Sequence, residues 1–216
     1  MGSVGLSLVL LAAAVTLMWR QKDLRSQMGW GGLLAIPVLA LPAIFLTHFW
    51  LEAFVVKGVI FIISRLVISF SLGALASGVY EAVLHHRFNT TVRSRRQLLW
   101  LLAGPILLVL LSLITSWPFV NLLLCALVLD LAIVLIWRPD LTWDALFSAL
   151  AMALLYLIVY FLAYRGVPGE AIGFWTFKLS GLTVGGVPLE EMLTILLFGA
   201  LWGPIYVAIK DIHQTD

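Results

Sequence analysis

Apolar residues run through the chain in seven long stretches, separated by short polar or charged segments. The stretches cover residues 4–19, 30–51, 66–84, 98–115, 118–137, 146–164 and 188–209. Because a helix needs roughly 20 apolar residues to cross the hydrocarbon core of a bilayer, each stretch predicts one membrane span. The pattern therefore predicts an all-α fold, a polytopic membrane bundle of about seven transmembrane helices.

A further apolar segment, residues 52–65, precedes the third stretch but is too short for a clean additional span. It contains Lys57, whose charge is costly inside hydrocarbon. We expect this segment to be interfacial or re-entrant. Pro37, Pro42 and Pro204 fall inside stretches, where a proline can kink a helix.

Composition excludes an ordinary soluble domain. Of the 216 residues, 62% are hydrophobic and 11% are charged, and the mean hydropathy is +1.09, whereas soluble domains carry about a quarter charged residues. We therefore expect residues 1–216 to form a single integral membrane domain. The net charge of +2 does not indicate a nucleic-acid partner, and the lone Cys125 permits neither an intrachain disulfide nor a cysteine metal site.

The connections carry the basic residues unequally. With seven spans, nine of the thirteen basic residues fall on one side, and the other four are Lys57, Arg65, Arg165 and Lys178. Because cytoplasmic loops are enriched in lysine and arginine, this predicts an N-terminus outside the cell and a cytoplasmic C-terminus.

Four carboxylates lie inside or at the edge of the predicted spans, where ionisable groups are costly and often functional: Glu81, Asp130, Glu190 and Glu191. We expect Asp130 to pair across the bundle with a serine, a tyrosine or an arginine. Glu81 precedes His85 by four residues on one helix face, which suits an ion pair or hydrogen bond that steadies the helix end, with a metal site as the alternative. The histidines lack metal-binding spacing, and we predict no metal site.

Glu190 and Glu191 open the last stretch, directly after Gly185-Gly186-Val187-Pro188. Proline in the first turn followed by acids is typical of a helix N-terminus, so one hypothesis is a structural cap. The alternative is that two adjacent carboxyls at the hydrocarbon edge, desolvated and mutually repelling, retain a proton near neutral pH and act as a general acid. Thr194 lies within reach of either carboxyl from the same helix side.

Small residues predict where helices approach closely. Gly73 and Ser77 stand four apart in the third stretch, and Gly199 and Gly203 do so in the last, a spacing typical of tight helix packing in membranes. We expect both helices to lie inside the bundle. No strong internal repeat is evident along the chain.

The region 138–210 and its flank carry motifs of a known family. These are Trp137-Arg138-Pro139-Asp140, the loop from Phe174-Trp175 to Ser180-Gly181-Leu182, and Gly186-Val187-Pro188-Leu189-Glu190-Glu191 before an apolar helix. On these residues the chain resembles the lycopene cyclase domain of the membrane, non-flavin carotenoid cyclases. It is also similar to uncharacterised bacterial relatives whose third span ends in a pair like Tyr80-Glu81.

The resemblance implies that the functional unit has two related halves, each with an acidic motif, in tandem or on two chains. Where the second motif is expected, before the third span, this sequence has Ile63-Ser64-Arg65. A homodimer, a related partner subunit and a relative with different chemistry each remain open.

The resemblance also implies a reaction in which a carboxylic acid protonates a terminal alkene of a carotenoid or other isoprenoid, and the cation closes a ring. Glu190 or Glu191 would be the acid. Trp175, Phe198 and Trp202 would contact the substrate and stabilise the cation with their ring faces, with Thr194 nearby, although packing alone is the more common role of such rings. Such an isomerase of carotenoid biosynthesis needs no cofactor and acts on a hydrophobic substrate within the bilayer, here a bacterial or archaeal plasma membrane.

Two other functions remain open. One is a non-enzymatic membrane subunit that binds a prenyl lipid or a partner protein, with the acidic pair as a helix cap. The other is a small transporter in which Asp130 and Glu81 relay ions.

Overall fold

The structure, a computed structural model, describes residues 2–40, 51–84, 102–117, 119–164 and 180–210. The helices are α1 (Gly2–Arg20), α2 (Arg25–Ala35), α4 (Leu51–Leu84), α6 (Ala103–Ile114), α7 (Phe119–Trp137), α8 (Thr142–Tyr164) and α10 (Leu189–Lys210). Short 3-10 turns, η1 (Lys22–Leu24) and η3 (Pro139–Leu141), precede α2 and α8, and a π-helical turn, η2 (Ile36–Ala40), continues α2. Strands β1 (Thr183–Val184) and β2 (Val187–Pro188) form a hairpin before α10.

Three of the described helices have the length and apolar composition of membrane spans. Within α4, α7 and α8 run apolar segments long enough to cross a bilayer, Ile62–Val79, Val120–Trp137 and Pro139–Leu162. The bent pair Val4–Arg20 and Lys22–Ala40, which turns by 113°, would count as a fourth. Leu113, Ile114 and Ile136 are 78%, 79% and 77% exposed on the outside of the bundle, as lipid-facing side chains are. The all-α membrane character is confirmed; seven spans and their orientation stay predictions.

The segment 52–65 is helical, and the apolar segment of spanning length in α4 begins at Ile62; an interfacial or re-entrant placement of the segment stays a prediction. Residues 51–84 form one continuous α-helix of 34 residues. No proline interrupts this stretch, so the ladder of backbone hydrogen bonds continues past Lys57. The third span is thus the end of a longer helix that starts well before it.

The two halves of the chain have a similar order of helices, although the sequence shows no strong internal repeat. In the first, α1 ends on Trp19-Arg20, the turn η1 ends on Leu24, and α2 follows. In the second, Trp137-Arg138 closes α7, the turn η3 ends on Leu141, and α8 follows. The third long helix packs on the first two in both cases, α4 on α1 and α2, and α10 on α7 and α8. We call these the first repeat (α1, α2, α4) and the second repeat (α7, α8, α10); α6 joins them.

Small residues bring the second and third helix of each repeat into close contact, as their spacing predicts. A Cβ added at Gly73 of α4 would lie 2.5 Å from the carbonyl oxygen of Gly31 in α2. A Cβ added at Gly199 of α10 would lie 2.9 Å from the carbonyl oxygen of Ser148 in α8. Both repeats therefore use the same kind of backbone approach.

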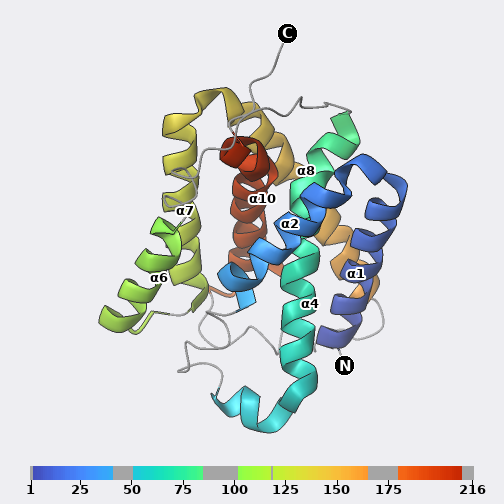
Figure 1. Ribbon diagram of the computed structural model, residues 1–216. Coiled ribbons are helices and arrows are strands. Elements are labelled where there is room, and N and C mark those ends of the chain that lie inside the picture. Colours follow the sequence, from blue (N-terminus) through green and yellow to red (C-terminus); the bar gives the residue numbers. More distant parts are fainter. Residues whose placement is uncertain (1, 41–50, 85–101, 118, 165–179, 211–216) are drawn as a thin grey trace.

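The two repeats meet along α4 and α10, which Figure 1 shows in the middle of the bundle, with α1 on one side and α6 and α7 on the other. The indole Nε1 of Trp202 in α10 donates a hydrogen bond of 2.9 Å to the Gly31 carbonyl in α2. α1 begins at one end of the bundle and α10 finishes at the opposite end. Helix α10 therefore starts, with its acids, at the end where α1 starts.

We expect Gly73→Ala to destabilise the protein by about 1–3 kcal/mol, because the added methyl group must displace backbone. Gly5→Ala is the matched control, since a Cβ there has nothing within 4 Å and both changes raise helix propensity equally. Thermal unfolding in detergent, followed by tryptophan fluorescence, measures the difference. Equal unfolding temperatures for the two variants would contradict the close α2–α4 contact.

Candidate functional site

A tight hairpin places the acidic pair at the start of α10. Strands β1 and β2 are antiparallel with Val184 opposite Val187, which leaves Gly185 and Gly186 as a two-residue turn. Their φ angles are +59° and +84°, and a positive φ at both positions is the type I′ hairpin turn that glycine favours. This hairpin of two two-residue strands is the strand structure of the described residues in an otherwise all-α fold. It turns the chain directly into the first turn of α10.

Two tyrosines of α8 lie beside this turn. The hydroxyl of Tyr160 donates to the carbonyl of Gly186 over 3.3 Å. Tyr156, one helical turn earlier, donates to Oε1 of Glu191. Both tyrosines are buried, and their ring centroids lie 6.2 Å apart. Helix α8 therefore holds both the hairpin and the second acid.

Glu191 is the more enclosed of the two acids. Its side chain also interacts electrostatically with the guanidinium of Arg65 in α4. Its second carboxyl oxygen, Oε2, is buried and has no hydrogen-bond partner among the described residues. A buried oxygen without a partner is costly, so the carboxyl has capacity for one more interaction at Oε2.

The Glu190 side chain contacts the segment just before the hairpin. Its Oε1 accepts a hydrogen bond of 2.6 Å from the backbone N–H of Ser180, an exposed residue, while its Oε2 is buried without a partner in the part of the chain described. The expectation that Thr194 bonds to a carboxyl of the pair is not met. The Thr194 hydroxyl donates to the backbone carbonyl of Glu190 over 2.8 Å, because a threonine in a helix reaches the carbonyl four residues back.

Arg65 occupies the position in the first repeat that Glu191 occupies in the second. Arg65 stands eight residues before Gly73, and Glu191 stands eight residues before Gly199, the two glycines that make equivalent contacts. The segment Ile63-Ser64-Arg65 thus fills the place of the second acidic motif. The two repeats bring an arginine and a glutamate together there.

The aromatic candidates on α10 are packed inside the protein. Phe198 and Trp202 stack with centroids 4.9 Å apart and are 1% and 4% exposed. Trp202 is further fixed by its bond to the Gly31 carbonyl. Trp175 and His85 lie outside the described residues, as does the side chain of Glu81, so the Glu81–His85 pair stays a prediction.

Asp130 has a backbone partner rather than the predicted serine, tyrosine or arginine. Its Oδ1 accepts a hydrogen bond of 2.7 Å from the N–H of Gly104, in the first turn of α6. The first N–H groups of a helix have no partner inside it, so a carboxylate from α7 satisfies one of them. Asp130 is 6% exposed and caps α6 from the neighbouring helix.

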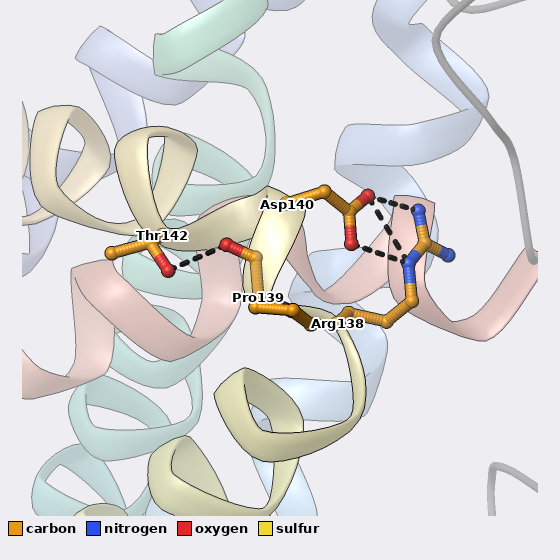
Figure 2. Close-up of polar contacts among 4 residues, drawn as sticks. All are labelled: Arg138, Pro139, Asp140 and Thr142. Atoms are coloured by element: carbon orange, nitrogen blue, oxygen red, sulfur yellow. Dashed lines mark hydrogen bonds and ion pairs between the residues drawn. The ribbon is translucent and has the colours of Figure 1, made fainter.

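The motif Trp137-Arg138-Pro139-Asp140 forms the turn between α7 and α8. Figure 2 shows the Arg138 side chain turned onto the Asp140 carboxylate, with Nη2 and Oδ2 2.7 Å apart, while the Thr142 hydroxyl donates to the Pro139 carbonyl over 2.7 Å. Asp140 is 52% exposed. The motif fixes a surface turn and contributes no side chain to the acidic site.

Sequence reasoning missed two members of the site. Tyr156 gave no signal, since a tyrosine in an apolar stretch is usual in membrane helices. Arg65 stands where the family resemblance leads one to expect an acid, and nothing in the sequence indicates that it interacts with Glu191. No group of three or more potential metal ligands occurs among the described residues.

The family model named Lycopene cyclase matches residues 4–75 and 114–209. The chain belongs to the lycopene cyclase family. The two matched stretches fall on the two structural repeats, so the resemblance, expected mainly in 138–210, extends to the first repeat. Neither the curated proteins nor the solved structures compared with the chain match it.

Asp130→Ala should destabilise the protein by about 1–3 kcal/mol, because it leaves the buried N–H of Gly104 without an acceptor. Asp130→Asn keeps an acceptor oxygen and should unfold close to the unchanged protein. Thermal unfolding in detergent tests both. An Asn variant as unstable as the Ala variant would show that the charge, not the cap, is what the fold requires.

Proposed function

We propose that this protein isomerises a carotenoid or related isoprenoid in the bilayer by proton-initiated cyclisation. The observation that carries the proposal is the buried Oε2 of Glu191, which lacks a partner among the described residues, in a chain of the lycopene cyclase family. A carboxyl group at such a site can deliver a proton to a substrate that offers no other polar contact.

The reaction follows from this geometry. The carboxylic acid gives its proton to a terminal alkene carbon, so a C–H bond forms and the π bond breaks. The tertiary cation is attacked by a neighbouring double bond of the same molecule, which closes the ring. A carboxylate of the acidic pair then takes a proton from the ring carbon next to the cation. Nothing is oxidised, and substrate and product are isomers.

Phe198 supports a path for the substrate along α10. It follows Glu191 by seven residues, two helical turns, and so lies on the same face of the helix. An aromatic face at that position stabilises a cation. Trp175 and Trp202 remain further candidates for this role.

The two repeats support a catalytic unit that is complete in one chain. The family model matches residues 4–75 and 114–209, which lie on the two repeats, although the first repeat has Arg65 where the second has the acid. Arg65 and Glu191 come from different repeats and interact within the same chain. We therefore propose a monomer as the active form, without a partner subunit.

We also propose seven spans with the N-terminus outside. If each of the three helices of a repeat crosses once and α6 crosses once, the number of crossings is odd and both repeats have the same orientation. The start of α1 and the end of α10 at opposite ends of the bundle support this. The acidic pair would face the outer side of a bacterial or archaeal plasma membrane.

Expression in cells that accumulate lycopene should yield cyclised carotenoids, detected by chromatography. Glu191→Gln should reduce product formation by roughly 10²–10⁴-fold, the usual contribution of a general acid. Glu190→Gln should also reduce it, because the second carboxylate takes up the departing proton.

Asp140→Asn is the matched control, since it removes one carboxylate from an exposed ion pair outside the site. It should retain activity. Lycopene left unchanged by well-expressed protein would rule out lycopene as the substrate. Full activity of both glutamine variants would rule out the acidic pair.

A green fluorescent protein fused after Asp216 should fluoresce, and alkaline phosphatase fused there should be inactive, because the C-terminus is cytoplasmic. Fusions within the loop 165–179 should show the reverse. Equal results at both sites would overturn the proposed topology.

A further inference from the structure

We infer that Tyr156 positions Glu191 as the proton donor, by holding Oε1 so that the transferred proton resides on Oε2. This inference rests on the proposed function and assigns separate roles to two acids that the family resemblance leaves equivalent. The inference follows from the hydrogen-bond partner that each carboxyl group has at Oε1.

The partner of each acid differs in kind. Oε1 of Glu191 accepts from a buried tyrosine hydroxyl, whereas Oε1 of Glu190 accepts from the backbone N–H of exposed Ser180. A hydrogen bond from the N–H of an exposed residue stabilises a carboxylate and keeps it near solvent, so it favours the charged form. A phenol in apolar surroundings can donate to the carbonyl oxygen of a protonated carboxylic acid equally well. Glu190 is therefore suited to remain ionised, and Glu191 to hold the proton.

Both acids have a buried Oε2 without a partner among the described residues, so the assignment rests on their Oε1 partners and on Arg65, which interacts with Glu191. A carboxylate oxygen buried without a partner loses its solvation and gains nothing in return. If the oxygen instead carries hydrogen, no negative charge is buried, and the O–H can face an alkene. With Oε1 fixed by Tyr156, rotation of the carboxyl group is restricted and Oε2 keeps one direction. Positioning of this kind contributes to the rate through orientation.

The groups that act on Glu191 are Tyr156 from α8 and Arg65 from α4, while the adjacent Glu190 is turned to Ser180. Burial favours the protonated form at rest. Arg65 and the Tyr156 hydroxyl stabilise the carboxylate that remains when the proton leaves. Their effect is therefore larger after proton transfer than before it, which is what lowers a barrier.

Infrared spectroscopy of the purified protein in lipid nanodiscs tests the inference without substrate. The protein at neutral pH should show the carbonyl band of a protonated carboxylic acid, at a frequency lowered by the hydrogen bond to that carbonyl. Glu191→Gln should remove the band and Glu190→Gln should leave it. Tyr156→Phe should move the band to higher frequency, since the bond to Oε1 is lost.

Tyr160→Phe is the matched control for the band. It removes a buried hydroxyl one turn along α8 that bonds to the Gly186 carbonyl instead, so the band should stay in place. In lycopene-accumulating cells, Tyr156→Phe should lower the rate of ring formation about ten-fold, which corresponds to loss of one strong hydrogen bond.

Three results would overturn the inference: no protonated band in the unchanged protein, a band that Glu190→Gln removes, or a band that Tyr156→Phe leaves in place. The first two do not depend on folding of the tyrosine variant. If no carotenoid is cyclised but the band behaves as expected, the proposed function fails and the proton assignment stands.

Discussion

A carboxyl group inside an apolar helix bundle must find hydrogen-bond donors, and this requirement governs where the acids of the protein lie. Asp130 meets it with the N–H of Gly104 at the start of α6. Glu190 meets it in part with Ser180, and Glu191 with Tyr156. The donors in the first two cases are backbone groups left free by a helix start or a hairpin. The fold thus supplies polar partners at the few places where its backbone is not already paired.

The two repeats share their packing but differ at the site. In both, a glycine of the third helix lets the second helix approach closely, through Gly73 in α4 and Gly199 in α10. Eight residues before these glycines the two repeats differ: the first has Arg65 and the second has Glu191. Packing tolerates this difference because it depends on small residues further along the helix. The close helix contact is therefore common to both repeats, whereas the charged residue eight positions earlier differs.

Much of the fold could be predicted from the sequence, because a bilayer requires long apolar segments. The extents of α7 and α10 follow their apolar stretches closely. The continuity of α4 could not be predicted, since a lysine at position 57 resembles the end of an apolar helix. The repeats were hidden because helices that all face lipid share apolar composition whether or not they are related. Within the site, the acids were evident as rare charges, whereas Tyr156 and the backbone partner of Asp130 have no sequence signature.

Arg65 stands in the first repeat where the second repeat has Glu191, and this difference affects how α4 and α10 can pack. Like charges facing each other in apolar surroundings repel, so an acid at both equivalent positions would force a shared proton or separate the repeats. Arg65 opposite Glu191 removes that repulsion and lets α4 and α10 pack with both groups enclosed. The first repeat therefore contributes a basic group and the second an acidic one, and the two interact where α4 and α10 pack.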